Sequence, residues 1–441
     1  MITSLSSALW LSLSSSTGSS YLACRLCRST SHRTAAMVPH ISSQLRRHKS
    51  AMQSATSHSS TDMVTNLFDN NGDDDTSPSA NDGNASSVVR PQSVAVIGAG
   101  AVGSYYGARL WQAGHHVQFY ARRGQRTDGS SAFDALKQKG MSITSIHGNF
   151  EIPADKLQVF DSTEAMQPTP DWILIGLKST ALSAIPDLIL PLLLPSDTNT
   201  NNKTNILVLM NGLVDEDLIH HLKQATGQST DDPKEPLKCC RTFYGGLAFI
   251  AANRLGPGKI HHYYAGPIAA GVASTQVTGD GTCPDTTVRQ EIQSLWQPVQ
   301  AVPCQWEDNL LLGRWRKMLW NLPFNGISVA MGGIPTNEIV TDPGLRALAR
   351  HVMQETLAVA QAECGPASLT DSHVEQMFAI TDGMDAYRPS TMIDLLEKRP
   401  MEVLYLFRKP LERAQALGVP TPHLFTIVTM IEALQRKHNL F

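Results

Sequence analysis

Three glycines follow a short apolar run near residue 98, at the spacing of a phosphate-binding turn. The run 94–97 leads directly into Gly98-x-Gly100-x-x-Gly103, and helix-compatible residues continue beyond it. In such a turn the first glycine permits a tight bend, the second lets the backbone approach a pyrophosphate, and the third lets helix and strand pack closely. The helix N-terminus then offers its free N–H groups to the phosphates. We predict a dinucleotide site rather than a purely structural turn. The residues expected to form it are Gly98, Ala99, Gly100, Ala101, Val102 and Gly103.

The second apolar strand indicates which dinucleotide binds. A site for NAD or FAD carries an acidic residue about 20 positions after the first glycine, which holds the ribose 2′-hydroxyl. No Asp or Glu occurs between Gly98 and Asp128, and the strand 116–121 is followed by Arg122 and Arg123. A guanidinium group suits a 2′-phosphate, because each charge-assisted hydrogen bond contributes roughly 1.5–3 kcal/mol. We therefore predict NADPH as the cofactor, with two solvated loop arginines as the alternative.

A lysine and two asparagines recur every four residues in the run RWRKMLWNLPFNG. Lys317, Asn321 and Asn325 therefore share one face of a helix, among apolar neighbours that indicate burial. Buried polar side chains are costly unless they meet polar partners. A substrate in a cleft is one such partner, and ordinary hydrogen bonds between helices are the alternative.

Four more polar residues are candidates for ligand binding because of their positions next to apolar runs. Lys178 and Asn211 each follow an apolar strand directly, at the carboxyl end where open α/β sheets bind ligands. A simple turn explains either position equally well. Ser390 and Glu402 flank an apolar run and lie 12 residues apart. By spacing alone, Ser390 is also compatible with a helix N-cap and Glu402 with a solvated helix charge.

The elements that would position these residues change in kind along the chain. From residue 92 apolar strands alternate with helical stretches, which is typical of a doubly wound α/β domain with a mostly parallel sheet. After about residue 306 long helical stretches dominate. We predict a Rossmann-type domain over 92–305 and an all-helical domain over 306–441, with the ligand in the cleft between them. Strands are expected at 94–97, 117–120, 172–177, 206–210, 242–250 and 259–264. Helices are expected at 103–113, 214–225, 288–296, 311–329, 342–363, 371–379, 401–417 and 423–437. Surface loops are expected at 196–205, 227–238 and 274–286.

The first 61 residues differ in composition from the rest. They contain no Asp or Glu, six Lys and Arg residues, and many Ser and Thr. This composition is typical of an organelle transit peptide. We expect a mitochondrial leader over 1–61, with plastid or cytoplasm as alternatives, and a disordered linker over the Asp/Asn/Ser-rich residues 62–91. A secretory signal fits less well, because the apolar run 8–11 is short; an extension without a targeting role is the remaining alternative.

Composition and charge bound the class of protein. With 42% hydrophobic and 17% charged residues among 441, the chain is compatible with a soluble globular protein of two domains. The net charge is 36 − 39 = −3, and no basic stripe predicts a nucleic-acid partner. No run of 18 apolar residues predicts a membrane span. Three His-His pairs lack the i, i+4 spacing of a helical zinc site, so we expect no metal.

The order and spacing of these residues resemble the ketopantoate reductase family over residues 92–437. Proteins of that family have a Rossmann domain and a helical domain, arranged as in 6-phosphogluconate dehydrogenase, with NADPH and ketopantoate in the cleft. They make pantoate for vitamin B5 and coenzyme A. The features that carry the resemblance are the glycine turn, the strand ends at Lys178 and Asn211, the Lys317-x3-Asn321-x3-Asn325 helix and the Ser390…Glu402 pair.

The resemblance implies a role for each of these residues. Lys317 corresponds to the general acid that protonates the C2 oxygen of the substrate as hydride arrives, a role that needs its pKa lowered to about 7–8 by burial. Asn211 would lie near the nicotinamide, and Glu402 would accept the terminal hydroxyl of the substrate. The donors to the substrate would be Asn321, Asn325 and Ser390. The contacts to the 2′-phosphate and the adenosine side of the cofactor would be Arg122 and Lys178.

The implied activity is NADPH-dependent reduction of ketopantoate (2-dehydropantoate) to pantoate, by an oxidoreductase that acts on a CH–OH group. A reductase of another 2-oxo acid is one alternative, because relatives of this fold reduce other such acids. A protein that senses NADPH without catalysis is another. The expected partner is a small-molecule substrate, and a homodimer is the assembly to be tested.

Overall fold

The structure is a computed structural model, and it describes residues 90–124, 131–193, 204–232, 235–273 and 286–441. The expected leader over 1–61 and nearly all of the expected linker over 62–91 lie outside these ranges. Most of the loops expected at 196–205 and 274–286 also lie outside them.

A mixed sheet forms the N-terminal part of the described chain. Its strands follow the order β4-β3-β9-β8-β7-β6-β1-β2-β5, and β10 pairs with β9. Within the described ranges, seven of nine strand pairings are parallel, and two, β3–β4 and β8–β9, are antiparallel. The prediction of a mostly parallel sheet is confirmed. The strands are β1 (Ser93–Ile97), β2 (His116–Tyr120), β3 (Met141–Ser145), β4 (Phe150–Ile152), β5 (Gln158–Phe160), β6 (Trp172–Ile175), β7 (Asn205–Val208), β8 (Phe243–Gly256), β9 (Lys259–Val272) and β10 (Cys304–Trp306).

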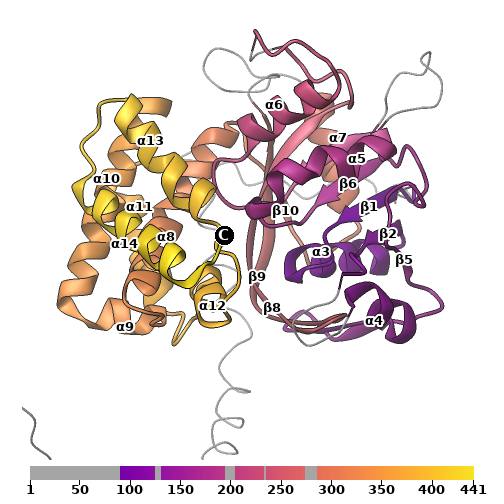
Figure 1. Cartoon of the computed structure of the whole chain (residues 1–441), viewed down its shortest axis with the longest axis horizontal. Helices are drawn as coiled ribbons and strands as arrows, with labels where there is room; N and C mark the ends of the chain where they lie inside the picture. The colour runs from indigo at the N-terminus through magenta and orange to yellow at the C-terminus, as the bar shows by residue number, and fades with distance from the viewer. Residues whose placement is uncertain (1–89, 125–130, 194–203, 233–234, 274–285) are drawn as a thin grey trace, which may run out of the picture. The chain divides into compact units, whose positions relative to one another are not determined.

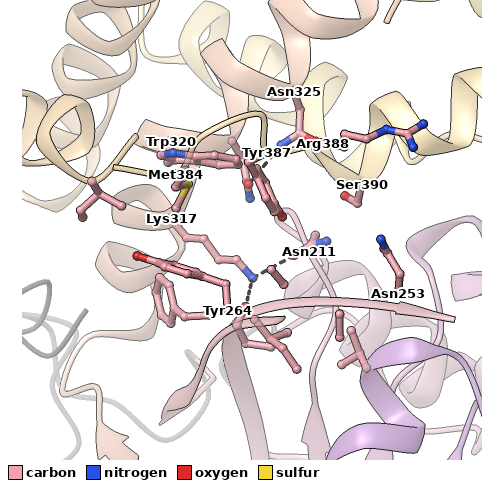
Figure 2. A pocket seen from close by; sticks show the side chains of 18 of the residues that line it. Asn211, Asn253, Tyr264, Lys317, Trp320, Asn325, Met384, Tyr387, Arg388 and Ser390 are labelled. Carbon is pink, nitrogen blue, oxygen red and sulfur yellow. Dashed lines mark hydrogen bonds between the residues drawn. The ribbon is translucent and has the colours of Figure 1, made fainter. Parts of the chain in front are cut away.

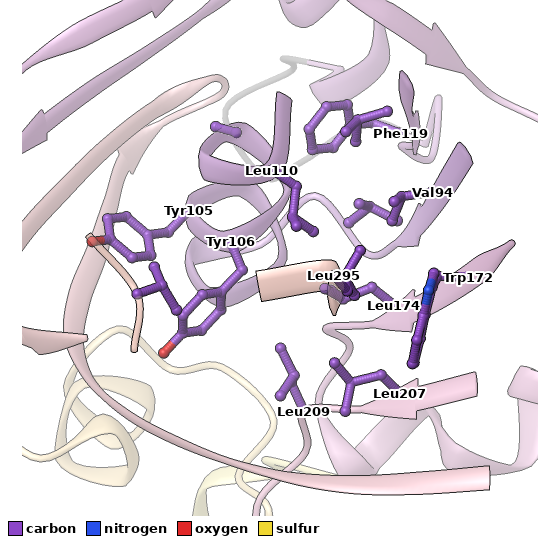
Figure 3. Close-up of a cluster of buried hydrophobic side chains, with 14 of the residues drawn as sticks. Val94, Tyr105, Tyr106, Leu110, Phe119, Trp172, Leu174, Leu207, Leu209 and Leu295 are labelled. Atoms are coloured by element: carbon purple, nitrogen blue, oxygen red, sulfur yellow. The ribbon is translucent and has the colours of Figure 1, made fainter. Parts of the chain in front are cut away.

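Helices cover both faces of the central strands. Along β1, Val94 and Val96 belong to one apolar core, whereas Ala95 and Ile97 belong to another on the opposite face. The first core includes side chains of α3 and α7, and Figure 3 shows part of it around Tyr106. Burial on both faces explains why the strand sequences are continuously apolar. The helices of this part are α3 (Ala101–Gln112), α4 (Ala132–Lys139), η1 (Ser179–Ala184), α5 (Ile185–Leu193), α6 (Asp215–Ala225) and α7 (Thr286–Trp296).

Strands β8 and β9 form a hairpin that is much longer than predicted (Figure 1). Each strand has 14 residues, so the predicted strands 242–250 and 259–264 cover only about half of them. Three register shifts interrupt the hairpin. Such bulges bend a strand and re-aim its side chains. The bent half carries residues 248–253 and 263–264 to the wall of the cavity described below.

The chain after β10 is all helical in its described part, as predicted. Helix α8 (Leu310–Ala330) packs against α10, α12 and α14, and a single apolar core joins α8 to the helices around it (Figure 1). The other helices are α9 (Thr336–Thr341), α10 (Pro343–Cys364), α11 (Asp371–Asp382), α12 (Ser390–Leu396), η3 (Leu404–Arg408), α13 (Lys409–Ala416) and α14 (Pro422–His438).

The stretch 401–417 departs from the single α-helix predicted for it. Its first turn is the π-helical turn η3, and α13 follows directly. Pro410 has no N–H to donate to the carbonyl of Leu406. The N–H of Lys409 donates to the carbonyl of Leu404, five residues back. The wider π-helical turn accommodates Pro410, which cannot make the α-helical hydrogen bond.

Candidate active site

A cavity of about 200 Å³ lies where the β8–β9 hairpin and the end of β7 meet helices α8, α11 and α12 (Figure 2). Four of the residues expected at the substrate line it, together with two expected at the cofactor. These six residues are Val102, Asn211, Lys317, Asn321, Asn325 and Ser390.

Lys317 lines this cavity, and its ammonium group points toward Asn211 (Figure 2). Its Nζ atom donates to Asn211 Oδ1 and to the carbonyl oxygen of Ala248, both at 2.9 Å, and lies 5.6 Å from the ring centroid of Phe249. Removal from water lowers the pKa of Lys317 to about 7; the positive charge of Arg314 adds to this effect and Glu402 opposes it. An amine with such a pKa can hold and release a proton at neutral pH.

Arg314 joins the helix that carries Lys317 to the sheet. It lies one turn before Lys317, and its guanidinium binds both carboxylate oxygens of Asp215 at 2.8 and 2.9 Å. Its third nitrogen donates to the carbonyl of Met210 at 2.7 Å and to that of Gly246 at 3.2 Å. These bonds fix α8 against the end of β7 and the first residues of β8. Neither partner of this pair was predicted from the sequence, although Arg314 has the i, i+3 spacing to Lys317.

The turn after β7 holds Asn211 in place from the other side. Gly212 has φ +88°, and a Cβ atom there would lie 2.3 Å from the carbonyl oxygen of Tyr405. Tyr405 belongs to η3, and its carbonyl accepts the N–H of Leu213 at 3.1 Å. The π-helical turn therefore supplies an acceptor to this turn, and no residue with a side chain fits at position 212.

Asn321 and Asn325 connect the helix α8 to the start of α12. The amide nitrogen of Asn325 donates to Asn321 Oδ1 at 3.2 Å. The amide oxygen of Asn325 accepts the N–H of Thr391 at 3.3 Å. Asn325 thus uses one hydrogen bond between helices, which was the alternative to substrate binding, and the bond to Asn321 lies within α8; both residues still line the cavity. Ser390 is exposed at the first residue of α12, and Pro389 is the N-cap, so the N-cap alternative for Ser390 is wrong.

Glu402 does not line the cavity around Lys317. It is buried, and its Oε1 atom accepts the N–H of Ser179 at 2.8 Å. It lines a second cavity, of about 410 Å³, with Ser179, His221 and Tyr405 among its neighbours. The alternative of a solvated helix charge is wrong. The structure does not bring Glu402 to Asn321, Asn325 and Ser390 as the family resemblance implies, because its carboxylate binds the start of η1. Its role at the substrate stays a prediction.

Lys178 forms an ion pair across the two parts of the chain. Its Nζ atom lies 2.5 Å from Asp394 Oδ1 on α12, and Arg399 reaches the same oxygen at 3.3 Å. Burial raises the pKa of Asp394, and these two cations oppose the rise. In the sequence Asp394 is a single acidic residue within an apolar run, and nothing nearby indicates that it pairs with Lys178. The expected contact of Lys178 with the cofactor stays a prediction.

The glycine turn has the shape that a dinucleotide needs. Gly98 has φ +107°, and a Cβ atom on Gly103 would lie 2.2 Å from the carbonyl oxygen of Gly98. Over Gly100 the space is open, because the nearest atom to a Cβ there would be the Gly176 oxygen at 3.8 Å. No side chain caps the N-terminus of α3 and no acidic residue lies in its first turn. These residues fit the pyrophosphate of a dinucleotide.

Two arginines follow β2, where the adenosine ribose would lie. Arg122 is exposed and forms no ion pair with any described residue. Arg123 binds Asp161 at 2.8 Å and covers the ring of Phe133 at 4.8 Å. Arg122 therefore has its guanidinium available to a 2′-phosphate, whereas Arg123 already has a partner.

Two further features bear on the class of protein. Among the described residues there is no group of three or more His, Cys, Asp and Glu side chains that could hold a metal ion. No helix in the described ranges combines the length and the apolar character that crossing a bilayer requires.

Comparisons with known proteins agree on the family. The family model described as Ketopantoate reductase PanE/ApbA matches residues 94–274, and the model described as its C terminal part matches residues 309–435. A 2-dehydropantoate 2-reductase of Nostoc sp. is 30% identical over 346 residues, covering 78% of this chain and 96% of its own.

Solved structures extend the agreement to the fold. The crystal structure of 2-dehydropantoate 2-reductase from Geobacter metallireducens has 32% identity and a TM-score of 0.63, over 77% of this chain and 99% of that one. A D-mandelate dehydrogenase solved with NADH and anilino(oxo)acetate shares the fold, with 19% identity, a TM-score of 0.63 and coverage of 79% and 99%. With both halves of the chain matched in order, the protein belongs to the ketopantoate reductase family of oxidoreductases.

Proposed function

We propose that this protein reduces the C2 carbonyl of ketopantoate to the hydroxyl group of pantoate with NADPH. The observation that carries the proposal is the position of Lys317, whose ammonium group lies inside the cavity and has its pKa lowered to about 7. The Nostoc and Geobacter relatives named above support the choice of substrate.

Six of the residues that line the cavity have a part in this reaction. When bound, the nicotinamide cofactor supplies the hydride that C2 accepts. Lys317 donates a proton from Nζ to the C2 oxygen, so that the carbonyl gains one hydride and one proton and becomes a hydroxyl. Asn211 and the carbonyl of Ala248 orient the ammonium group. The amides of Asn321 and Asn325 and the hydroxyl of Ser390 bind the polar groups of the substrate.

The choice of NADPH over NADH rests on the end of β2. Arg122 is exposed and unpaired there among the described residues, and no acidic residue follows the strand to bind a ribose 2′-hydroxyl. The glycine turn would hold the pyrophosphate, and Lys178 would reach the adenosine side once it leaves Asp394. A steady-state comparison of NADPH and NADH with ketopantoate tests this choice directly.

The same assay tests the proposed activity. Loss of NADPH absorbance on addition of ketopantoate, with pantoate as product, supports the proposal. Turnover with other 2-oxo acids but not with ketopantoate would mean that the protein is a reductase of a different 2-oxo acid. Tight NADPH binding without turnover of any 2-oxo acid would favour a cofactor-sensing protein.

We also propose that residues 1–61 direct the protein to the mitochondrion. Their lack of acidic residues and their six basic residues support this location. A fluorescent fusion of residues 1–90 should co-localise with mitochondria. Accumulation in plastids or a diffuse signal would favour the alternatives.

A further inference from the structure

A single arginine nitrogen bridges two strands at the point where they separate beside the cavity described above. The pairing of β7 with β8 ends at Val208 and Gly245. Just beyond that point, Nη1 of Arg314 donates to the carbonyl oxygens of Met210, at 2.7 Å, and Gly246, at 3.2 Å. The guanidinium therefore continues the connection between the two strands where their backbone pairing stops.

The two acceptors of Lys317 follow directly after this bridge. Asn211 is the residue after Met210, and Ala248 is two residues after Gly246. Lys317 Nζ donates to Asn211 Oδ1 and to the carbonyl oxygen of Ala248, both at 2.9 Å (Figure 2). An ammonium group has three N–H donors, so these two bonds decide where the third one points. The separation of the two strand ends, which the guanidinium spans, thus sets the direction of the proton that a substrate would receive.

One glycine of β8 makes room for the arginine and its partner. A Cβ atom on Gly245 would lie 2.9 Å from Asp215 Oδ1 and 2.4 Å from the side chain of Leu310. Glycine inside a strand weakens the strand and often marks the close approach of another group. Arg314 is 2% exposed, and its Nε and Nη2 atoms bind the two carboxylate oxygens of Asp215. The pair is therefore buried against the sheet.

The charge of Arg314 also acts on Lys317. Burial and the positive charge of Arg314 together lower the pKa of Lys317 to about 7, and Glu402 opposes both. A second cation beside a lysine is one way in which proteins keep an amine able to exchange its proton. Asp215 balances part of the arginine charge, because the two groups form a bidentate pair. The other charged residues that line the cavity are Arg316 and Arg388.

We propose that Arg314 is the positioning residue of the proton donor. Its guanidinium sets the spacing of the two acceptors of Lys317, and its charge, balanced by Asp215, keeps the amine able to give up its proton. The inference rests on the proposed function, because it takes Lys317 as the proton donor. It goes beyond the attachment of α8 to the sheet, since an attachment alone would not change the acidity of the amine.

Three variants separate these effects through the profile of kcat against pH. Arg314→Met removes the positive charge and should move the midpoint upward by about one pH unit. Asp215→Asn leaves the arginine without its counter-charge and should move the midpoint downward. Arg314→Lys keeps a charge but has no planar fork to bridge two carbonyls. Its midpoint should stay near that of the unchanged protein, while kcat falls by about 10- to 100-fold because the amine is displaced.

The direction of the shifts distinguishes this role from a purely structural one. Opposite shifts in Arg314→Met and Asp215→Asn support the inference, because loss of the pair as a structural contact gives both variants the same defect. Shifts of the same sign, or no shift in either variant, would overturn it. An unchanged kcat in Arg314→Lys would remove the positioning role.

A neighbouring ion pair provides the matched control. Arg413 also connects the helical part of the chain to α6, through Glu216 at 2.8 Å, and it does not line the cavity of Lys317. Arg413→Met should therefore leave both the midpoint and kcat unchanged.

Chemical labelling of Lys317 makes the test independent of turnover. A neutral amine reacts with acetic anhydride and a protonated amine does not. The acetylation rate of Lys317 against pH, measured by mass spectrometry on the full-length protein, should show the same midpoints. If Asp215→Asn does not fold, Arg314→Met and Arg314→Lys decide the point, because only the first loses the charge, and equal midpoints in both would overturn the inference. If no 2-oxo acid is reduced, the proposed function fails, whereas the acetylation profile still shows whether Arg314 controls the amine.

Discussion

The Nζ atom of Lys317 lies 2.9 Å from the amide oxygen of Asn211, so the amine on helix α8 is hydrogen-bonded to the turn after β7. The two residues are 106 positions apart in the sequence, and neither is placed by its own element alone. Arg314 fixes the helix and Gly212 fixes the turn.

The pH dependence of turnover should report the ammonium group of Lys317. Its pKa is lowered to about 7, so the proton needed for reduction is present below that pH and is lost above it. We expect kcat for reduction to fall as pH rises through about 7. Asn211→Asp places a carboxylate beside Nζ, favours the ammonium form and should move the midpoint about one pH unit upward. Asn211→Ala adds no charge and should not move it upward. A profile of kcat against pH for the three proteins decides this point.

Loss of the Arg314–Asp215 pair should destabilise the protein and reduce turnover together. The Arg314 side chain is 2% exposed and that of Asp215 13%. Removing one partner of a buried pair costs about 3–5 kcal/mol. Asp215→Asn should therefore lower the free energy of unfolding by about that amount in urea titrations. The exposed pair Arg350–Glu375 offers a matched control, because Glu375→Gln should cost only about 0–1 kcal/mol. Similar costs in both variants would mean that Arg314 is not a structural anchor.

Two glycines of the turn after β1 should separate folding from cofactor binding. A Cβ atom on Gly103 would clash with the Gly98 carbonyl at 2.2 Å, so Gly103→Ala should lower the melting temperature. Gly100 has φ −80° and open space around a Cβ atom, so Gly100→Ala should fold normally. The new methyl group would occupy the space expected for the pyrophosphate, and the dissociation constant of NADPH should rise. Normal NADPH binding by Gly100→Ala would mean that the pyrophosphate does not lie against Gly100.

Cofactor choice should depend on one arginine more than on its neighbour. Arg122→Ala should raise KM for NADPH by about 10- to 100-fold, the equivalent of one charge-assisted hydrogen bond, and should leave KM for NADH nearly constant. Arg123 already binds Asp161, so Arg123→Ala should have a smaller effect. Steady-state kinetics with both cofactors provide the comparison. Equal effects of Arg122→Ala on NADPH and NADH would argue against the 2′-phosphate contact.

Local sequence patterns predicted what depends on neighbours in sequence. The glycine turn, the apolar strands on both sides of it and the shared helix face of Lys317, Asn321 and Asn325 all follow from periods of two or about four residues. The full length of β8 and β9 could not be read in this way, because the missed residues of each strand pair with the other strand, and residues 268–270 of β9 also pair with β10.

The positions of Glu402 and Lys178 depend on contacts between distant segments. Between Ser390 and Glu402 the chain leaves α12 and passes through Lys398 at φ +53°, so a spacing of 12 residues does not fix which cavity Glu402 faces. Lys178 meets Asp394 across 216 residues.

The most direct test of the account is the rate constant of Lys317→Ala with NADPH and the best 2-oxo acid substrate at neutral pH. We predict a fall in kcat of about 10²–10⁴-fold, the usual contribution of a general acid, with the dissociation constant of NADPH unchanged. An unchanged kcat in a folded variant that binds NADPH normally would contradict the role of this amine as the proton donor.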